Sequence, residues 1–143
     1  MSTLENERSL SKKQYIETAR NLLRFTTDRC LRLPKRLTFV ITTELIKTAQ
    51  EIYKYVLEIR SIYSKDDYLQ RRVDLCQIVI ARLDYLASNL DILQVYCPMG
   101  EPTDNKKKRK QLTPYTFEKW TALIEEENLL IKGLINSEKS KKK

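Results

Sequence analysis

The sequence contains no histidine and very little glycine. Its 143 residues include 2 glycines and 4 prolines. Histidine is the usual general base beside a catalytic serine or cysteine, and it belongs to most mixed zinc-ligand sets. Phosphate-binding GxGxxG and Walker A loops need several glycines within a short stretch. These absences exclude the common hydrolase, zinc and nucleotide sites, so we expect no enzymatic activity, no cofactor and no metal.

Cysteine is also scarce, and long apolar runs are missing. Cys30, Cys76 and Cys97 are widely spaced and form no CxxC pair, so we interpret them as reduced, mostly buried thiols. The first residues, MSTLENERSLSKK, lack the apolar region of a secretory signal, and no run of about 18 apolar residues follows. We therefore expect a soluble, cytoplasmic protein.

Composition and proline positions predict an all-α fold. Hydrophobic residues make up 41% of the chain and charged residues 32%, which is too apolar for a wholly disordered chain. Because proline is accepted in the first turn of a helix but interrupts its interior, Pro34 and Pro114 mark helix boundaries, the latter with Thr113 as the cap. We predict an up-down-up-down antiparallel four-helix bundle over residues 11–136. Its helices are expected at 11–33, 35–63, 65–96 and 115–136, with a polar segment at 1–10, a basic loop at 97–114 and a disordered lysine tail at 137–143.

The second predicted helix carries two apolar stripes rather than one. Two stripes imply two buried faces, one for the bundle core and one for a further contact. The first stripe is Phe39, Thr43, Ile46, Gln50, Tyr53 and Val56, and the second is Ile41, Leu45, Ile52 and Ile59. On the last helix, we expect Trp120 to be a packing anchor and Glu125–Glu127 to face water or a basic partner.

The net charge of +8 is unevenly distributed. Residues 8–36 carry a net +7, whereas the long middle of the chain, 37–96, carries −1. Clustered Lys and Arg displace counterions from a phosphate backbone, so we expect RNA or DNA as a partner. The run at 106–110 is expected to contact phosphate without sequence specificity, and the tail either binds or aids solubility. The candidate binding residues are Arg20, Arg24, Arg29, Arg32, Lys35, Arg36, Arg71, Arg72, Lys106, Lys107, Lys108, Arg109 and Lys110.

Each candidate group has a structural alternative. Arginines of the first helix either track phosphates or pair with Glu17 and Asp28. The rings of Tyr53, Tyr55 and Tyr63 either stack on bases or, as we favour, pack in the protein. Asp74 and Asp84 either hold a metal in a nuclease or, as we favour, pair with the nearby Arg71, Arg72 and Arg82.

The order of these landmarks resembles the accessory variability determinant (Avd) of diversity-generating retroelements and its relatives encoded in ribosomal RNA intervening sequences. The likeness covers residues 15–136. It rests on LPKRLTF, ITTELIKTAQEIYKYVLEIRSIY, RRVDLCQIVIARLDYLASNLDIL and TPYTFEKWTALIEEENLLIKGLIN, with Leu33-Pro34-Lys35-Arg36 and Ala81-Arg82-Leu83-Asp84 as signposts.

This resemblance implies a bacterial or phage-encoded protein that assembles as a homopentameric barrel. Such a protein would bind the element's reverse transcriptase with its template RNA or RNA-DNA hybrid and would support mutagenic complementary DNA synthesis without catalysis of its own. The segment at 97–114 is longer than the family's usual connection, and the lysine tail is extra. The alternative is a structural helical-bundle adaptor that binds a protein partner and uses its charge for solubility.

Overall fold

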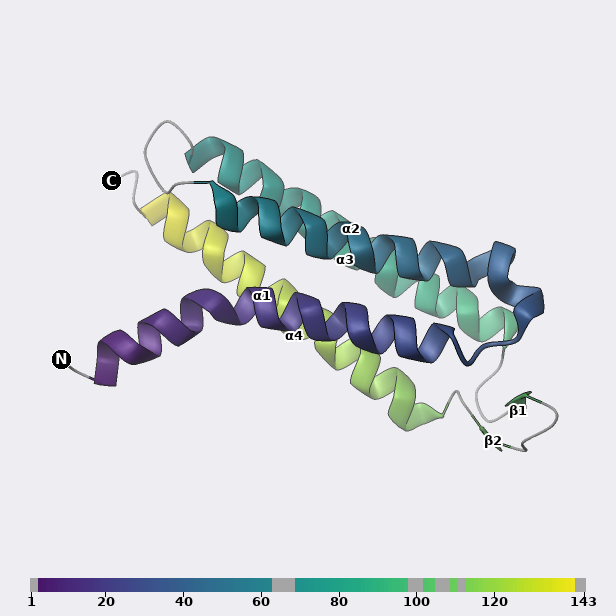
Figure 1. Ribbon diagram of the computed structural model, residues 1–143. Coiled ribbons are helices and arrows are strands. Elements are labelled where there is room, and N and C mark those ends of the chain that lie inside the picture. Colours follow the sequence, from purple (N-terminus) through teal and green to yellow (C-terminus); the bar gives the residue numbers. More distant parts are fainter. Residues whose placement is uncertain (1–2, 63–68, 98–101, 105–108, 111–112, 141–143) are drawn as a thin grey trace.

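The computed structural model describes residues 3–62, 69–97, 102–104, 109–110 and 113–140, with the backbone alone described for 3–12, 102–104 and 109–110. Figure 1 shows four long helices packed side by side, which confirms the predicted all-helical bundle. They are α1 (Thr3–Cys30), α2 (Thr43–Ser61), α3 (Leu69–Tyr96) and α4 (Pro114–Ser140).

Several boundaries differ from the prediction. The helix α1 begins at Thr3, so the expected polar segment at 1–10 is largely helical, and its first turns extend away from the other helices (Figure 1). The helix α4 continues to Ser140, into the region expected to be a disordered tail. Within the expected loop at 97–114, two short antiparallel strands form, β1 (Pro102–Asp104) and β2 (Arg109–Lys110).

Pro34 separates α1 from the next helical segment as predicted. It has φ −58° and ψ 141°, an extended conformation that breaks the helical path. The chain then passes through a 3-10 turn, η1 (Lys35–Leu37), and a π-helical turn, η2 (Thr38–Thr42), before α2. The segment predicted as one helix at 35–63 is therefore three helical pieces, and residue 63 lies outside the described residues.

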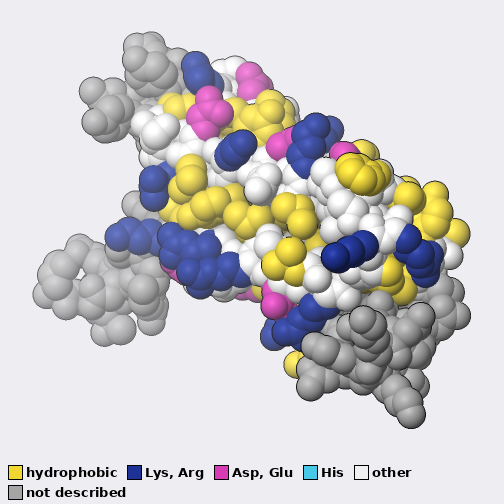
Figure 2. Space-filling view, turned by 45° about the vertical axis from the view of Figure 1, so that its right-hand side comes forward, with side chains coloured by type: hydrophobic (Ala, Val, Ile, Leu, Met, Phe, Trp, Pro, Cys, Tyr) yellow, Lys and Arg dark blue, Asp and Glu magenta, His cyan; other side chains and the backbone are white. Residues whose placement is uncertain are grey.

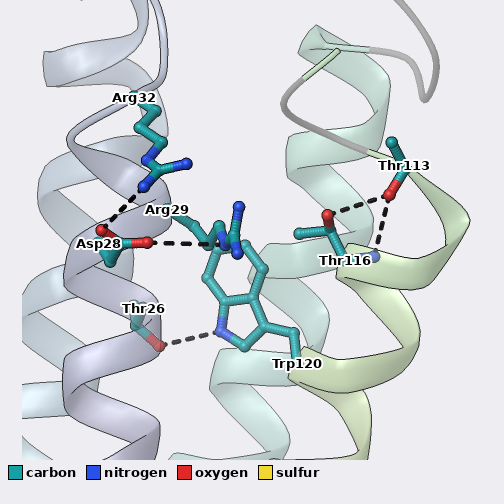
Figure 3. A network of polar contacts seen from close by, with 7 residues as sticks. All are labelled: Thr26, Asp28, Arg29, Arg32, Thr113, Thr116 and Trp120. Carbon is teal, nitrogen blue, oxygen red and sulfur yellow. Dashed lines mark hydrogen bonds and ion pairs between the residues drawn. The ribbon is translucent and has the colours of Figure 1, made fainter. Parts of the chain in front are cut away.

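The start of α4 is capped as its sequence predicts. The backbone N–H of Thr116 donates to Thr113 Oγ1 at 3.2 Å, and Pro114 occupies the first helical position (Figure 3). A threonine cap satisfies one of the backbone donors left free at a helix start, and proline there sacrifices no hydrogen bond.

Trp120 anchors α4 to α1. Its ring is fully buried, and its Nε1 donates to the Oγ1 of the buried Thr26 at 2.9 Å (Figure 3). The ring edge of Phe25 packs against it with the centroids 5.7 Å apart. Burying a tryptophan is favourable when its N–H finds a partner, so this contact fixes how α1 and α4 meet.

Charged and tyrosine side chains join α2 to α3. Glu58 pairs with Arg71 at 3.0 Å, Glu51 with Arg82 at 3.5 Å, and Glu44 accepts a hydrogen bond from Tyr85 at 2.8 Å. In these three pairs the residue number decreases along α2 while it increases along α3, so the two helices run antiparallel. None of the described helices contains an apolar stretch that could cross a lipid bilayer.

The core face of α4 contains two glutamates among apolar side chains. Trp120, Ile124, Glu127, Ile131 and Glu138 are all buried and recur at helical spacing. Glu125 and Glu126 are exposed as expected, but the expectation for Glu127 is wrong, because its side chain faces the core.

Glu127 is fully buried, and neither carboxyl oxygen has a hydrogen-bond partner among the described residues. Burial, with a smaller contribution from the charge of Glu126, raises the pKa of Glu127 to about 9. Loss of hydration disfavours the charged form, so this carboxyl is protonated at neutral pH.

The three cysteines are buried thiols, as predicted. Burial raises the pKa of Cys30 to about 12 and that of Cys76 to about 11. Because the thiolate is the reactive form, these thiols pack as small apolar groups and are chemically inert at neutral pH.

Candidate nucleic-acid interface

The predicted basic residues of α1 and the following turn divide into paired and unpaired groups. Arg24, Lys35 and Arg36 are exposed and make no ion pair with any residue that the structure describes. They therefore keep their full charge for a partner. Figure 2 shows one face of the molecule, where Lys and Arg side chains lie on both sides of a band of hydrophobic side chains.

The other three predicted arginines of this region, Arg20 and Arg29 in α1 and Arg32 just after it, contact acidic residues of α1. Arg20 pairs with Glu17 at 2.8 Å, and its Nε donates to the Tyr53 hydroxyl at 3.3 Å. Arg29 and Arg32 share Asp28, at 3.8 and 3.5 Å respectively (Figure 3). Exposed pairs of this kind contribute little to stability, but they lower the net charge, because Arg20 and Glu17 sum to zero and Arg29, Arg32 and Asp28 sum to +1.

The two arginines at the start of α3 lie in different environments. Arg71 is exposed and pairs with Glu58. Arg72 is buried, and its side chain is fully engaged with Glu138 at 3.1 Å and with two backbone carbonyls at the end of α2, those of Ile59 at 2.7 Å and Ile62 at 2.6 Å. Arg72 thus adds hydrogen bonds to carbonyls at the end of α2, where the helix itself supplies few donors. It does not fit the predicted role, because a buried guanidinium cannot reach a phosphate.

Most of the basic run at 106–110 lies outside the residues that the structure describes. Lys106, Lys107 and Lys108 lie outside the described residues, and Arg109 and Lys110 are described through the backbone of β2. Their contact with phosphate stays a prediction.

A groove between α1 and α4 gathers basic and apolar side chains that the sequence alone did not bring together. It has a volume of about 410 Å³ and is lined by Asn21, Arg24, Phe25, Lys119 and Leu123. The Lys119 Nζ lies 5.5 Å from the centroid of the Phe25 ring, and the Arg29 Cζ lies 5.1 Å from it. Lys119 was missed because its meeting with Arg24 depends on how two distant helices pack.

A second groove, of mixed polarity, lies between η2, the start of α2 and α3. It has a volume of about 440 Å³, and the apolar Phe39, Val40 and Ile92 line it together with the polar Glu44 and Asn89. The side chain of Phe39 is 97% exposed, which is unusual for so large an apolar group. This surface is a candidate for contact with another protein chain.

The outer stripe predicted on the second helix is only partly buried. Phe39 is exposed and Ile46 and Tyr53 are half-buried, whereas Val56 at the end of this stripe is buried. The inner stripe, Ile41, Leu45, Ile52 and Ile59, is buried in the bundle. The inner face is therefore confirmed as core, and a partner for the outer face remains a prediction.

The two aspartates considered for a metal site, Asp74 and Asp84, do not form the ion pairs that we favoured for them with Arg71, Arg72 and Arg82. Asp74 is exposed and accepts a hydrogen bond from Gln70 at 2.8 Å, while the arginines nearby in sequence contact glutamates instead. Asp84 is exposed and forms no ion pair with the described residues. In the described part of the chain, no three His, Cys, Asp or Glu side chains lie together as a metal site would require.

Two of the three tyrosines considered for base stacking are packing groups. Tyr53 and Tyr55 are half-buried and pack against the core, and Tyr63 lies outside the described residues. The favoured interpretation of packing therefore holds for the first two.

No family model, no curated protein and no solved structure matches the chain.

Proposed function

We propose that this protein is a non-catalytic accessory subunit of a retroelement reverse transcriptase, which binds the polymerase and its template RNA or RNA-DNA hybrid to support mutagenic complementary DNA synthesis. The observation that carries the proposal is the unpaired positive charge of Arg24, Lys35 and Arg36, all exposed at one end of α1 and in the turn that follows. Free cations on a rigid scaffold suit a polyanion, because each phosphate contact releases a counterion.

Assembly would multiply these contacts. We further propose an up-down-up-down bundle that forms a homopentamer in the cytoplasm of a bacterial host, with the outer stripe of α2 as part of the subunit interface. The exposure of Phe39 and the groove that it lines support a contact of this kind. Several identical subunits would then offer many weak phosphate contacts whose affinities combine.

The proposal is tested by co-purifying the tagged full-length chain with the products of its neighbouring genes, with and without nuclease treatment. A reverse transcriptase recovered together with RNA supports it. Light scattering on the purified protein, compared with Phe39→Glu, tests the assembly: the parent should have a pentamer's mass and the variant a lower one. A parent protein that is monomeric contradicts the pentamer.

An adaptor that binds a protein partner is the second candidate, and the exposed apolar side chains of Phe39 and Val40 at the second groove favour it. In that case the protein would bind no RNA at low salt, and Phe39→Glu would abolish recovery of its protein partner. Neutralising Arg24, Lys35 and Arg36 would then leave that recovery unchanged.

A further inference from the structure

The groove between α1 and α4 has the chemistry of a nucleotide site. Arg24 and Lys119 come from different helices, are both exposed, and make no ion pair with any described residue. No acidic residue lines the groove. Two exposed cations line it without a counter-charge, so the groove favours an anionic ligand.

Apolar side chains form most of the remaining lining of the groove. Phe25 and Leu123 line it, with both side chains half-buried against the core. The Arg29 Cζ and the Lys119 Nζ lie over the Phe25 ring, 5.1 Å and 5.5 Å from its centroid. A base that stacks on this ring therefore displaces the exposed Lys119 side chain, whose charge is then placed to contact the phosphate. The exposed amide of Asn21 adds donors and acceptors that suit the polar edge of a base.

A buried hydrogen bond beneath the groove joins α1 and α4, the two helices that form its walls. Trp120 follows Lys119 in α4, Thr26 follows Phe25 in α1, and the hydrogen bond between these buried neighbours is 2.9 Å long. A volume of about 410 Å³ lies at the small end of the range of about 300–1,000 Å³ typical of small-ligand sites. The groove is therefore preformed and of a size for one nucleotide rather than a duplex.

We infer that this groove binds one unpaired nucleotide of a single-stranded RNA, with its base against Phe25 and Leu123 and its flanking phosphates on Arg24 and Lys119. The inference rests on the proposed function and refines it. RNA bound here must be single-stranded, because bases in a duplex are stacked and cannot enter a groove.

The test compares three labelled strands of equal length, namely an oligoadenylate, the same backbone without bases, and an RNA duplex. Fluorescence anisotropy with the full-length protein at fixed salt should give affinity in the order oligoadenylate, abasic strand, duplex. One stacked base predicts a roughly five-fold or greater preference for oligoadenylate over the abasic strand. Phe25→Leu should remove most of that preference, provided that its circular dichroism and melting temperature show a folded protein.

The charges are tested with a matched pair of double variants. Arg24→Gln with Lys119→Gln should lower the slope of log affinity against log salt for oligoadenylate by about 1.4, the value for two single-strand phosphate contacts. Lys54→Gln with Lys132→Gln removes the same charge from other exposed positions and should leave the slope unchanged.

Each outcome decides between claims. If the two double variants have equal slopes, or if the parent binds the three strands equally, the groove is not the site although the protein still binds RNA. If polyglutamate of matched charge competes as well as oligoadenylate, the groove recognises acidic polymers and the inference is wrong. If the parent binds none of the strands at low salt, the proposed function itself fails.

Discussion

Glu127 provides the sharpest test of the packing, because replacing it should stabilise the protein in a pH-dependent way. In the folded state its carboxyl has a pKa raised from 4.5 to about 9, and burial is the largest cause. An unfolded chain releases this proton near pH 4.5, whereas the folded chain holds it. The contribution of Glu127 to the unfolding free energy is therefore most favourable below pH 4.5 and is lost as the pH rises towards 9.

The size of the effect follows from the interval between the two pKa values. Each pH unit in that interval costs about 1.4 kcal/mol of unfolding free energy, so at pH 7 the cost of Glu127 is up to about 3 kcal/mol. Glu127→Gln has nearly the same shape and carries no titratable proton. The variant should therefore gain up to about 3 kcal/mol over the parent between pH 4.5 and pH 7.

The assay is urea denaturation of both proteins at several pH values and at one protein concentration. Glu125→Gln is the matched control, because Glu125 is exposed two positions away and its replacement should change stability by less than about 0.5 kcal/mol at any pH. If the stability difference between Glu127→Gln and the parent does not change with pH, Glu127 is not a buried neutral acid and the reasoning is refuted.

Three further predictions follow from the packing. Arg72→Gln should lower the unfolding free energy by about 3–5 kcal/mol in urea denaturation, since it leaves Glu138 buried without its ion pair, and a loss below about 1 kcal/mol would contradict the buried pair. Thr113→Ala should cost about 1 kcal/mol by removing the cap of α4, while Thr113→Ser should cost far less; equal losses would exclude the cap. Cys30 should react with a thiol reagent at pH 7.5 far more slowly than a free thiol does, because its pKa is about 12, and a free-thiol rate in the folded protein would contradict its burial.

Helix positions were predictable from local chemistry, because the signals involved act over a few residues. Pro34 ends the first helical segment and Thr113 caps the last helix, as their local sequences indicate. The π-helical turn at Thr38–Thr42 was not predicted, since its residues have the same apolar spacing as an ordinary helix.

The burial of Glu127 and Arg72 was detectable in principle. Glu127 lies three residues after Ile124 and four before Ile131, so helical spacing alone places it on the core face. Arg72 lies four residues before the buried Cys76. Their charge suggested surface positions, but the tertiary packing overrides that preference, through protonation in one case and ion pairing in the other.

The candidate site was less predictable, because its charge balance depends on which side chains meet. The arginines of the first helix were identified, but their division into paired Arg20, Arg29 and Arg32 and unpaired Arg24 depends on rotamers and on neighbouring acids. Lys119 enters the groove through contact between α1 and α4, which lie far apart in the sequence.

The central claim is that unpaired cations of this bundle bind RNA, and the salt dependence of RNA affinity tests it most directly. The measurement compares the parent with a variant in which Arg24, Lys35 and Arg36 are replaced by Gln, and with a control in which the exposed Lys47, Lys54 and Lys132 are replaced by Gln. The account predicts that the slope of log affinity against log salt falls by about 2 in the first variant and stays unchanged in the control, as three lost phosphate contacts require. Equal slopes in all three proteins, or affinity that does not respond to salt, would contradict it.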